Sequence, residues 1–170
     1  MPDRRDGDHI RPLIREIHAR RGRPTVVALS TSQVQTVVDR LYYDIDDDRV
    51  EVRLLLGRAA TTASAAGAQI VAALQLPYIA SHSWDDLLAE IDERSVSRRE
   101  FVVVADAADL LRDEDPDKWR ELVWSMCGGP YCLGGGWQSV VLIDEPLRWE
   151  QSRFGGVAGA RAAVERLFAA

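Results

Sequence analysis

The sequence has no long apolar run, and segments such as 54–56 and 140–143 are only a few residues each. A helix that crosses a bilayer needs about 20 such residues, so no membrane span is expected. The first residues, MPDRRDGDHIRPL, contain arginines but no apolar block and no small-residue cleavage site. This is not the pattern of a secretory signal. The sequence therefore predicts a soluble protein that stays in the cytoplasm.

Cysteine is scarce, and the only two residues, Cys127 and Cys132, flank the turn Gly-Gly-Pro-Tyr. No histidine and no second cysteine pair lies near them, which leaves too few ligands for a structural zinc site. A disulfide across the turn and two separate thiols both fit the sequence, and a reducing compartment favours the thiols. We expect no metal and no cofactor.

Motifs of the common enzyme classes are missing. There is no G-x-G-x-x-G signature, no P-loop and no G-x-S-x-G nucleophile elbow. The histidines, His9, His18 and His82, are isolated along the chain. His82 lies between Ser81 and Ser83, but neighbours in one loop do not easily align as nucleophile, base and orienting group. We therefore predict a protein that is not an enzyme.

Basic residues are outnumbered, with 21 Lys and Arg against 27 Asp and Glu and a formal charge of −6. The acidic excess is concentrated in 85–121, which has 13 acidic and 6 basic residues, whereas 1–24 has 7 arginines and 4 acids. An anionic surface repels nucleic acid, because phosphate contacts need Lys and Arg. A cationic protein is the better-matched partner, although solubility alone would also explain the excess.

Short apolar, β-branched segments alternate with segments of helical periodicity. Strands are predicted at 25–29, 50–56, 101–105 and 139–143. Helices are predicted around 10–17, 34–41, 61–74, 84–91, 119–126 and 157–168. This alternation favours a mostly parallel sheet flanked by helices. The fold class is therefore α/β, and 170 residues with 46% hydrophobic composition fit one domain with its own core.

The segment 76–94, LPYIASHSWDDLLAEIDER, predicts an amphipathic helix with a well-marked start. Its apolar residues recur at i, i+3, i+4 and i+7 and define one face: Trp84, Leu87, Leu88 and Ile91. Ser83 precedes this run and Asp86 follows three residues later, much as in a capping box. The helix is expected to begin directly after Ser83.

The opposite face of this helix is acidic. Asp86, Glu90 and Glu93 recur at i, i+4 and i+7, with Asp85 and Asp92 beside them. Like charges at i, i+4 destabilise a helix by a few tenths of a kcal/mol, and carboxylates near its C-terminal end oppose the helix dipole. Either the face is simply solvated, or the carboxylates are retained for a cationic partner.

In this order of elements the sequence resembles the barstar family, intracellular inhibitors of barnase-like ribonucleases. The resemblance covers about 24–144 and rests on Leu-Pro at 76–77, WDDLLAEI at 84–91, FVVVADAADLL at 101–111, Asp-Pro at 115–116 and the closing strand at 139–143. The segment WDDLLAEI at 84–91 is similar to the family segment N-W-D-A-L, and Ser83 stands in place of the asparagine.

The resemblance implies a compact domain at 24–145, with a mostly parallel sheet of three to four strands flanked by helices. Residues 1–23 would form a basic N-terminal helical extension and residues 146–170 a C-terminal one. It also implies an inhibitor of immunity or antitoxin type, which plugs the active site of a cationic ribonuclease or other toxin with the helix at 83–94 and the loop before it. Carboxylates on that helix would replace RNA phosphates.

The residues expected to bind the partner are Ile79, Ser81, Ser83, Asp85, Asp86, Ala89, Glu90 and Glu93. Asp85 matches the family's aspartate at the start of the binding helix, but Ala89 stands where a second contact aspartate is expected one turn later. Ile79, Ala80 and Ser81 replace two aromatics and a glycine, and Leu88 replaces a tryptophan. Loss of a charge at the centre of an interface costs several kcal/mol, so we expect a retained scaffold with a changed partner.

A second hypothesis is an interaction or regulatory domain that inhibits nothing. In it, the basic segment 1–23 docks on the acidic helix of the same chain or of a second copy, and a homo-oligomer would fit it.

Overall fold

The computed structural model describes residues 6–20, 22–43, 50–97, 100–129 and 138–169. Its strands are β1 (Thr25–Ala28), β2 (Glu51–Leu56), β3 (Glu100–Ala105) and β4 (Gln138–Asp144). Its α-helices are α1 (Asp6–Ala19), α2 (Thr31–Tyr43), α3 (Ala63–Leu74), α4 (Trp84–Ser97), α5 (Pro116–Met126), α6 (Pro146–Gln151) and α7 (Val157–Phe168). Three short 3-10 helices are η1 (Gly57–Ala59), η2 (Tyr78–Ser81) and η3 (Ala107–Asp109). Each predicted strand and helix is present with similar bounds, and α6 is an addition.

The strands form one parallel sheet in the order β1-β4-β3-β2. The predicted α/β fold with a mostly parallel sheet is confirmed, and the sheet is parallel at every described pairing. All six residues of β3 are buried. After Glu100 the strand is apolar, as expected for a strand in the middle of a parallel sheet that is covered on both faces, and this explains the run of valines.

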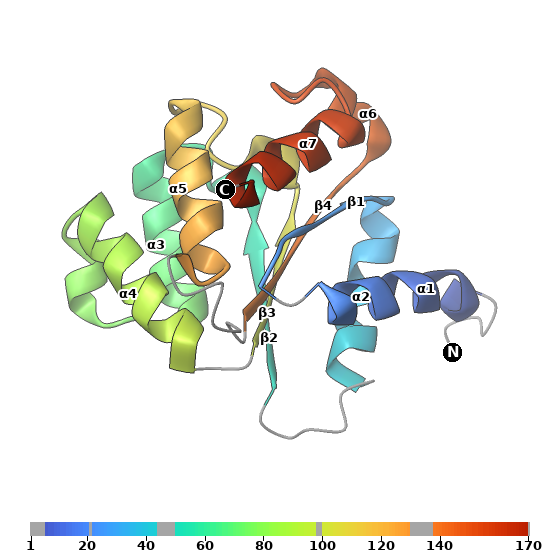
Figure 1. The fold of residues 1–170 in the computed structure, drawn as a ribbon, viewed down its shortest axis with the longest axis horizontal. Coiled ribbons are helices and arrows are strands. Elements are labelled where there is room, and N and C mark those ends of the chain that lie inside the picture. Colours follow the sequence, from blue (N-terminus) through green and yellow to red (C-terminus); the bar gives the residue numbers. More distant parts are fainter. Residues whose placement is uncertain (1–5, 21, 44–49, 98–99, 130–137, 170) are drawn as a thin grey trace.

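Helices cover both faces of the sheet (Figure 1). On one face α1 and α2 bury the smaller apolar cluster, which includes Ile10, Ile14 and Ile17. On the other face α3, α4, α5 and α7 bury the larger cluster around Val102 and Val104. The N-terminal helix is therefore packed into the core, on the face of the sheet opposite to α4.

Local signals in the sequence explain where the helices begin and end. The hydroxyl of Thr62 accepts a hydrogen bond from the Ala65 amide at 3.3 Å and caps the start of α3. Gln75 takes a left-handed conformation at its end, and Pro77 follows. Asp115 caps α5 in the same way, by accepting a hydrogen bond from the Asp117 amide.

The tryptophans differ in burial. Trp119 is buried, Trp124 is only partly buried, and Trp137 lies outside the described residues. Trp149, on the unpredicted helix α6, is fully buried and donates its indole N–H to the carbonyl of Val27 at 3.0 Å. Cys127 is buried, whereas Cys132, most of the glycine-rich segment 128–136 and the acidic turn at 44–48 lie outside the described residues.

Candidate protein-binding surface on helix α4

The start of α4 is fixed by Ser83. Its hydroxyl accepts a hydrogen bond from the Asp86 amide at 3.1 Å and donates one to the Asp86 carboxylate at 2.7 Å. The predicted cap is therefore present. The carboxylate of Asp86 bonds the Ser83 hydroxyl, whereas in a reciprocal capping box it would accept from the backbone amide of Ser83.

The apolar side of α4 anchors it to the domain. Leu87 and Ile91 are buried in the larger cluster. Trp84 is partly buried and donates its indole N–H to Glu121 on α5 at 2.8 Å, and the Lys118 ammonium lies 5.2 Å from its ring centre. This side of the helix packs against the domain, so only the opposite side is accessible to a partner.

The last turns of α4 are held by a buried ion pair. Arg94 makes two contacts with Glu100 at the start of β3, with Nε–Oε2 at 2.9 Å and Nη2–Oε1 at 3.1 Å. Glu100 is 1% exposed, and Arg53 on β2 approaches it to 3.7 Å from the other side. Two parallel contacts of this kind fix orientation as well as distance. Both ends of α4 are thus tied to the rest of the domain.

The outer side of α4 carries carboxylates that no described residue neutralises. Asp85, Ala89 and Glu93 are exposed, while Asp86 and Glu90 lie partly buried beside them. Within the described ranges, no hydrogen bond or ion pair engages the side chains of Asp85, Glu90 or Glu93. We call the carboxylates of Asp85, Asp86, Glu90 and Glu93 the α4 acidic surface. The exposed residues of this side are Asp85, Ala89 and Glu93. The sequence predicted Asp86, Glu90 and Glu93 instead, so the most exposed side of the helix is centred one residue earlier at the first two positions.

Asp92 does not belong to this surface, which corrects its predicted flanking position. It follows Ile91 on the flank of α4 that meets α5, and its carboxylate packs on Gly129, where a Cβ would come within 2.6 Å of it. Burial raises the pKa of Asp92 above its ordinary value of 3.8, and a hydrogen bond with Ser125 lowers it in part. The carboxylate of Asp92 is therefore engaged within the domain.

Replacement of Asp92 by asparagine should raise the stability of the protein at pH 7. A carboxyl group whose pKa is raised in the folded state makes folding less favourable once it ionises, and this cost disappears as the pH falls through that pKa towards 3.8. The gain should therefore shrink between pH 7 and pH 4. Urea titrations across this range measure it, and an Asp92→Asn variant that is less stable than the wild type at pH 7 would contradict the assignment.

The loop before α4 offers exposed apolar side chains. Tyr78 is 79% exposed and Ile79 is 49% exposed, whereas Ala80 is buried. The Ser81 hydroxyl donates to the Tyr78 carbonyl at 2.7 Å, and the rings of Tyr78 and His82 meet edge to face at 4.8 Å. Of the predicted loop contacts, Ile79 and Ser81 are accessible. Tyr78 was not among the residues predicted to bind the partner. Its place in a loop directly after Pro77 could have indicated an exposed aromatic side chain.

Between this loop and α3 lies a shallow groove of about 340 Å³. Its α3 wall consists of small side chains, and its other wall is the end of the loop: Ala63, Ser64, Gly67, Ala68, Ser81 and His82. The α4 acidic surface, the exposed loop and this groove lie at the same end of the domain, because η2 leads directly into α4 and both contact α3.

A second cluster of charges lies at the carboxyl ends of the strands, where parallel sheets often bind ligands. Asp144, at the end of β4, is buried and accepts hydrogen bonds from the amides of Ala108 at 3.0 Å and Glu145 at 2.8 Å. Arg148 pairs with Asp144 at 3.0 Å and also with Asp109. These groups satisfy one another, so they stabilise the ends of the strands and leave no carboxylate aimed outward.

The described residues contain no group of three or more His, Cys, Asp or Glu side chains that could hold a metal ion. None of the helices in those residues is long and apolar enough to cross a membrane. No protein-family model and no curated protein matches this chain. The case for a function therefore depends on the α4 acidic surface itself.

Proposed function

We propose that this chain is a barstar-like inhibitor of immunity or antitoxin type, which binds a cationic ribonuclease or another cationic toxin through the α4 acidic surface. One observation carries the proposal. The side chains of Asp85, Glu90 and Glu93 project from a helix whose two ends are fixed, and within the described residues none of them has a hydrogen bond or an ion pair.

The fixed helix gives the proposal its physical basis. A surface that is ordered before binding loses little conformational entropy when a partner docks on it. Carboxylates gathered on one side of a protein with a formal charge of −6 attract a cationic partner at long range and raise the association rate. They would occupy the positions that phosphates of RNA take on a ribonuclease, and would pair with its Arg, Lys and His side chains.

The position of Ala89 determines which kind of partner surface would be complementary to the α4 acidic surface. It lies midway between Asp85 and Glu93 on the exposed side of α4, and these two carboxylates are two turns apart, roughly 12 Å along the helix axis. A partner matched to them presents two cationic groups at about that spacing, with an apolar contact over Ala89 between them. Such a partner differs from one that requires a carboxylate at the position of Ala89.

Binding should be tight at low salt and weaken steeply as salt is added. We would titrate the full chain by calorimetry with barnase and with any basic nuclease or toxin that neighbouring genes encode. Such a neighbouring protein should bind more tightly than barnase, because Ala89 provides no central charge. Single-stranded RNA of matched charge is the negative control and should not bind. The absence of a complex with either protein at low salt would count against the proposal.

The intramolecular form of the alternative hypothesis finds no support in the fold. Helix α1 packs on the face of the sheet opposite to α4, with Ile14 and Ile17 buried there (Figure 1). The α4 acidic surface is therefore not covered by α1 of the same chain.

A further inference from the structure

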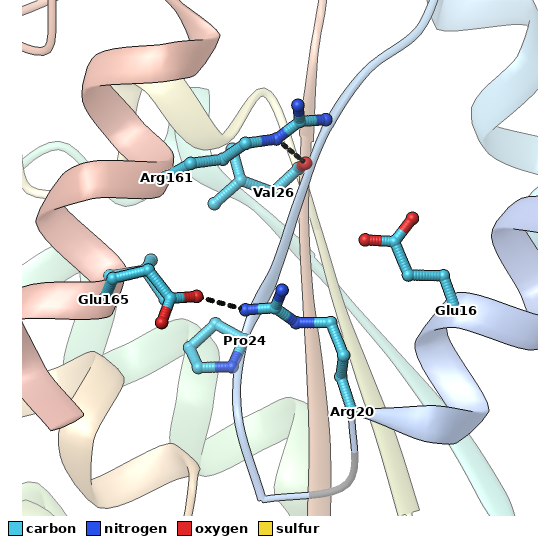
Figure 2. Close-up of a pocket in the computed structure, with 7 residues that line it drawn as sticks. Glu16, Arg20, Pro24, Val26, Arg161 and Glu165 are labelled. Atoms are coloured by element: carbon cyan, nitrogen blue, oxygen red, sulfur yellow. Dashed lines mark hydrogen bonds and ion pairs between the residues drawn. The ribbon is translucent and has the colours of Figure 1, made fainter.

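The two edges of the sheet differ in how their backbone is protected. At the β1 edge, the Arg161 guanidinium on α7 donates to the carbonyl of Val26 at 3.2 Å. Beside it, Arg20 and Glu165 form an ion pair at 2.6 Å across a cleft of about 360 Å³ (Figure 2). A helix and its side chains thus occupy the place where another strand would add to β1. This edge is closed.

Among the described residues, the β2 edge is protected at Leu56. The amide of Leu56 donates to Oε1 of the Gln69 side chain at 2.7 Å, and Nε2 of Gln69 donates to the Leu56 carbonyl at 3.3 Å. The amide group of Gln69 therefore bonds Leu56 as a neighbouring strand would. Backbone groups alternate in direction along a strand, so the N–H and C=O groups of Val52 and Leu54 point the same way, away from β3.

Along this part of β2 an apolar side chain is also exposed. Leu54 is 43% exposed, although it stands in a strand that pairs with β3 along six residues. An edge strand of this length with outward backbone groups and an exposed leucine is a template for pairing with another strand. Native edges are usually blocked by a proline, a bulge or a covering element, and among the described residues only Gln69 has that role here.

We propose that β2 pairs with β2 of a second copy of this chain, antiparallel and about a two-fold axis at Val52, so that the two sheets become continuous. In this register Glu51, which also pairs with Arg53 of its own chain, faces Arg53 of the partner subunit, and Leu54 faces the partner's Val50. Opposite charges directly across two strands stabilise the pair. The contact would also cover the exposed part of Leu54.

Neighbouring registers are less favourable. An axis at Arg53 would place Arg53 opposite the partner's Arg53, and an axis at Glu51 would place two glutamates opposite each other, which is destabilising. An axis at Leu54 would require the backbone groups of Leu56, which Gln69 already occupies. The charges and the Gln69 contact therefore select one register, with about six interchain hydrogen bonds.

The test is the mass of the full chain in solution, measured by light scattering at micromolar concentration. The wild type should have twice the chain mass of 18.9 kDa. It should keep that mass in high salt, which screens the repulsion between two acidic copies. Leu54→Lys should weaken dimerisation about a hundredfold, because it places a charge in an apolar contact. Leu147→Lys is the matched control, since Leu147 on α6 is 59% exposed and lies far from β2 in the sequence, and it should remain a dimer.

Two further variants separate loss of pairing from loss of folding. Leu54→Pro removes an N–H that points away from β3, so the inner sheet keeps its hydrogen bonds while the edge is blocked. Glu51→Arg sets like charges opposite each other and should also give the monomer, whereas Glu51→Gln should have a smaller effect. Circular dichroism checks that each variant is folded. A monomeric wild type, or folded Leu54→Lys and Glu51→Arg variants that dimerise as tightly as the wild type, would overturn the proposal.

Discussion

Replacement of Trp149 by alanine should lower the free energy of unfolding by about 3–5 kcal/mol, the usual effect of removing a large aromatic side chain from a core. Trp149 is fully buried, donates its indole N–H to Val27 on β1, and lies 5.8 Å from the Phe154 ring. The variant would leave a cavity and remove one hydrogen-bond donor from the Val27 carbonyl on the edge strand. Urea denaturation, followed by circular dichroism, measures the change.

Trp149→Phe separates the two contributions. Phenylalanine fills most of the same volume but cannot donate to the Val27 carbonyl, so this variant should lose about 1–2 kcal/mol. Trp124→Ala is a second control. Trp124 is only partly buried, so its loss should cost less than that of Trp149. A decrease below about 1 kcal/mol in Trp149→Ala would show that α6 does not help to hold β1.

Helices and strands with a clear apolar period could be predicted from the sequence. The bounds of α7 match the prediction at 157–168, and β3 matches to within one residue because its valines form a continuous buried run. Helix α6 was not predicted. It has six residues, too few for a period to show, and its structure depends on the burial of Trp149 against another part of the chain.

Only those features of the candidate site that depend on residues close together in the sequence could be predicted. The cap at Ser83 and the apolar face of α4 follow from spacing within one segment. The inward turn of Asp92 does not, because it depends on Gly129, which is distant in sequence. Nor could the sequence indicate that Arg94 pairs with Glu100 and that Arg53 approaches the same carboxylate, since β2, β3 and α4 meet only in the folded domain.

The arrangement separates two kinds of contact on one small domain. The α4 acidic surface depends on charge, so binding through it should be sensitive to salt. The β2 edge depends mainly on backbone hydrogen bonds and an apolar side chain, so pairing there should change less with salt than binding through α4. Measurements of both at the same salt concentrations would therefore tell a toxin complex from a dimer of this chain.

Reversal of the three unpaired charges on α4 should strongly weaken partner binding. In the variant Asp85→Lys, Glu90→Lys, Glu93→Lys, cationic groups of the partner would face lysines, so affinity should fall about a thousandfold, equivalent to about 4 kcal/mol. Asp86 is left unchanged because its amide and carboxylate bond Ser83 at the start of the helix. The folded structure should persist, since these three side chains have no partner in the described chain.

A matched variant controls for net charge. Asp39, Asp117 and Glu150 are exposed acids on α2, α5 and α6, and their reversal to lysine also brings the formal charge from −6 to zero. Long-range attraction would be lost equally in both triple variants, so the control should bind more slowly but form the same complex. Any additional loss of affinity in the α4 variant is therefore due to the loss of direct contacts with the partner.

The most direct measurement is a calorimetric titration of the wild type and both triple variants with each basic nuclease that neighbouring genes encode, at one low salt concentration. We predict a tight complex for the wild type, a modestly weaker one for the Asp39, Asp117 and Glu150 variant, and one about a thousandfold weaker than the wild type for the α4 variant. Equal affinities for the two variants would show that only net charge matters, and would contradict a binding surface on α4.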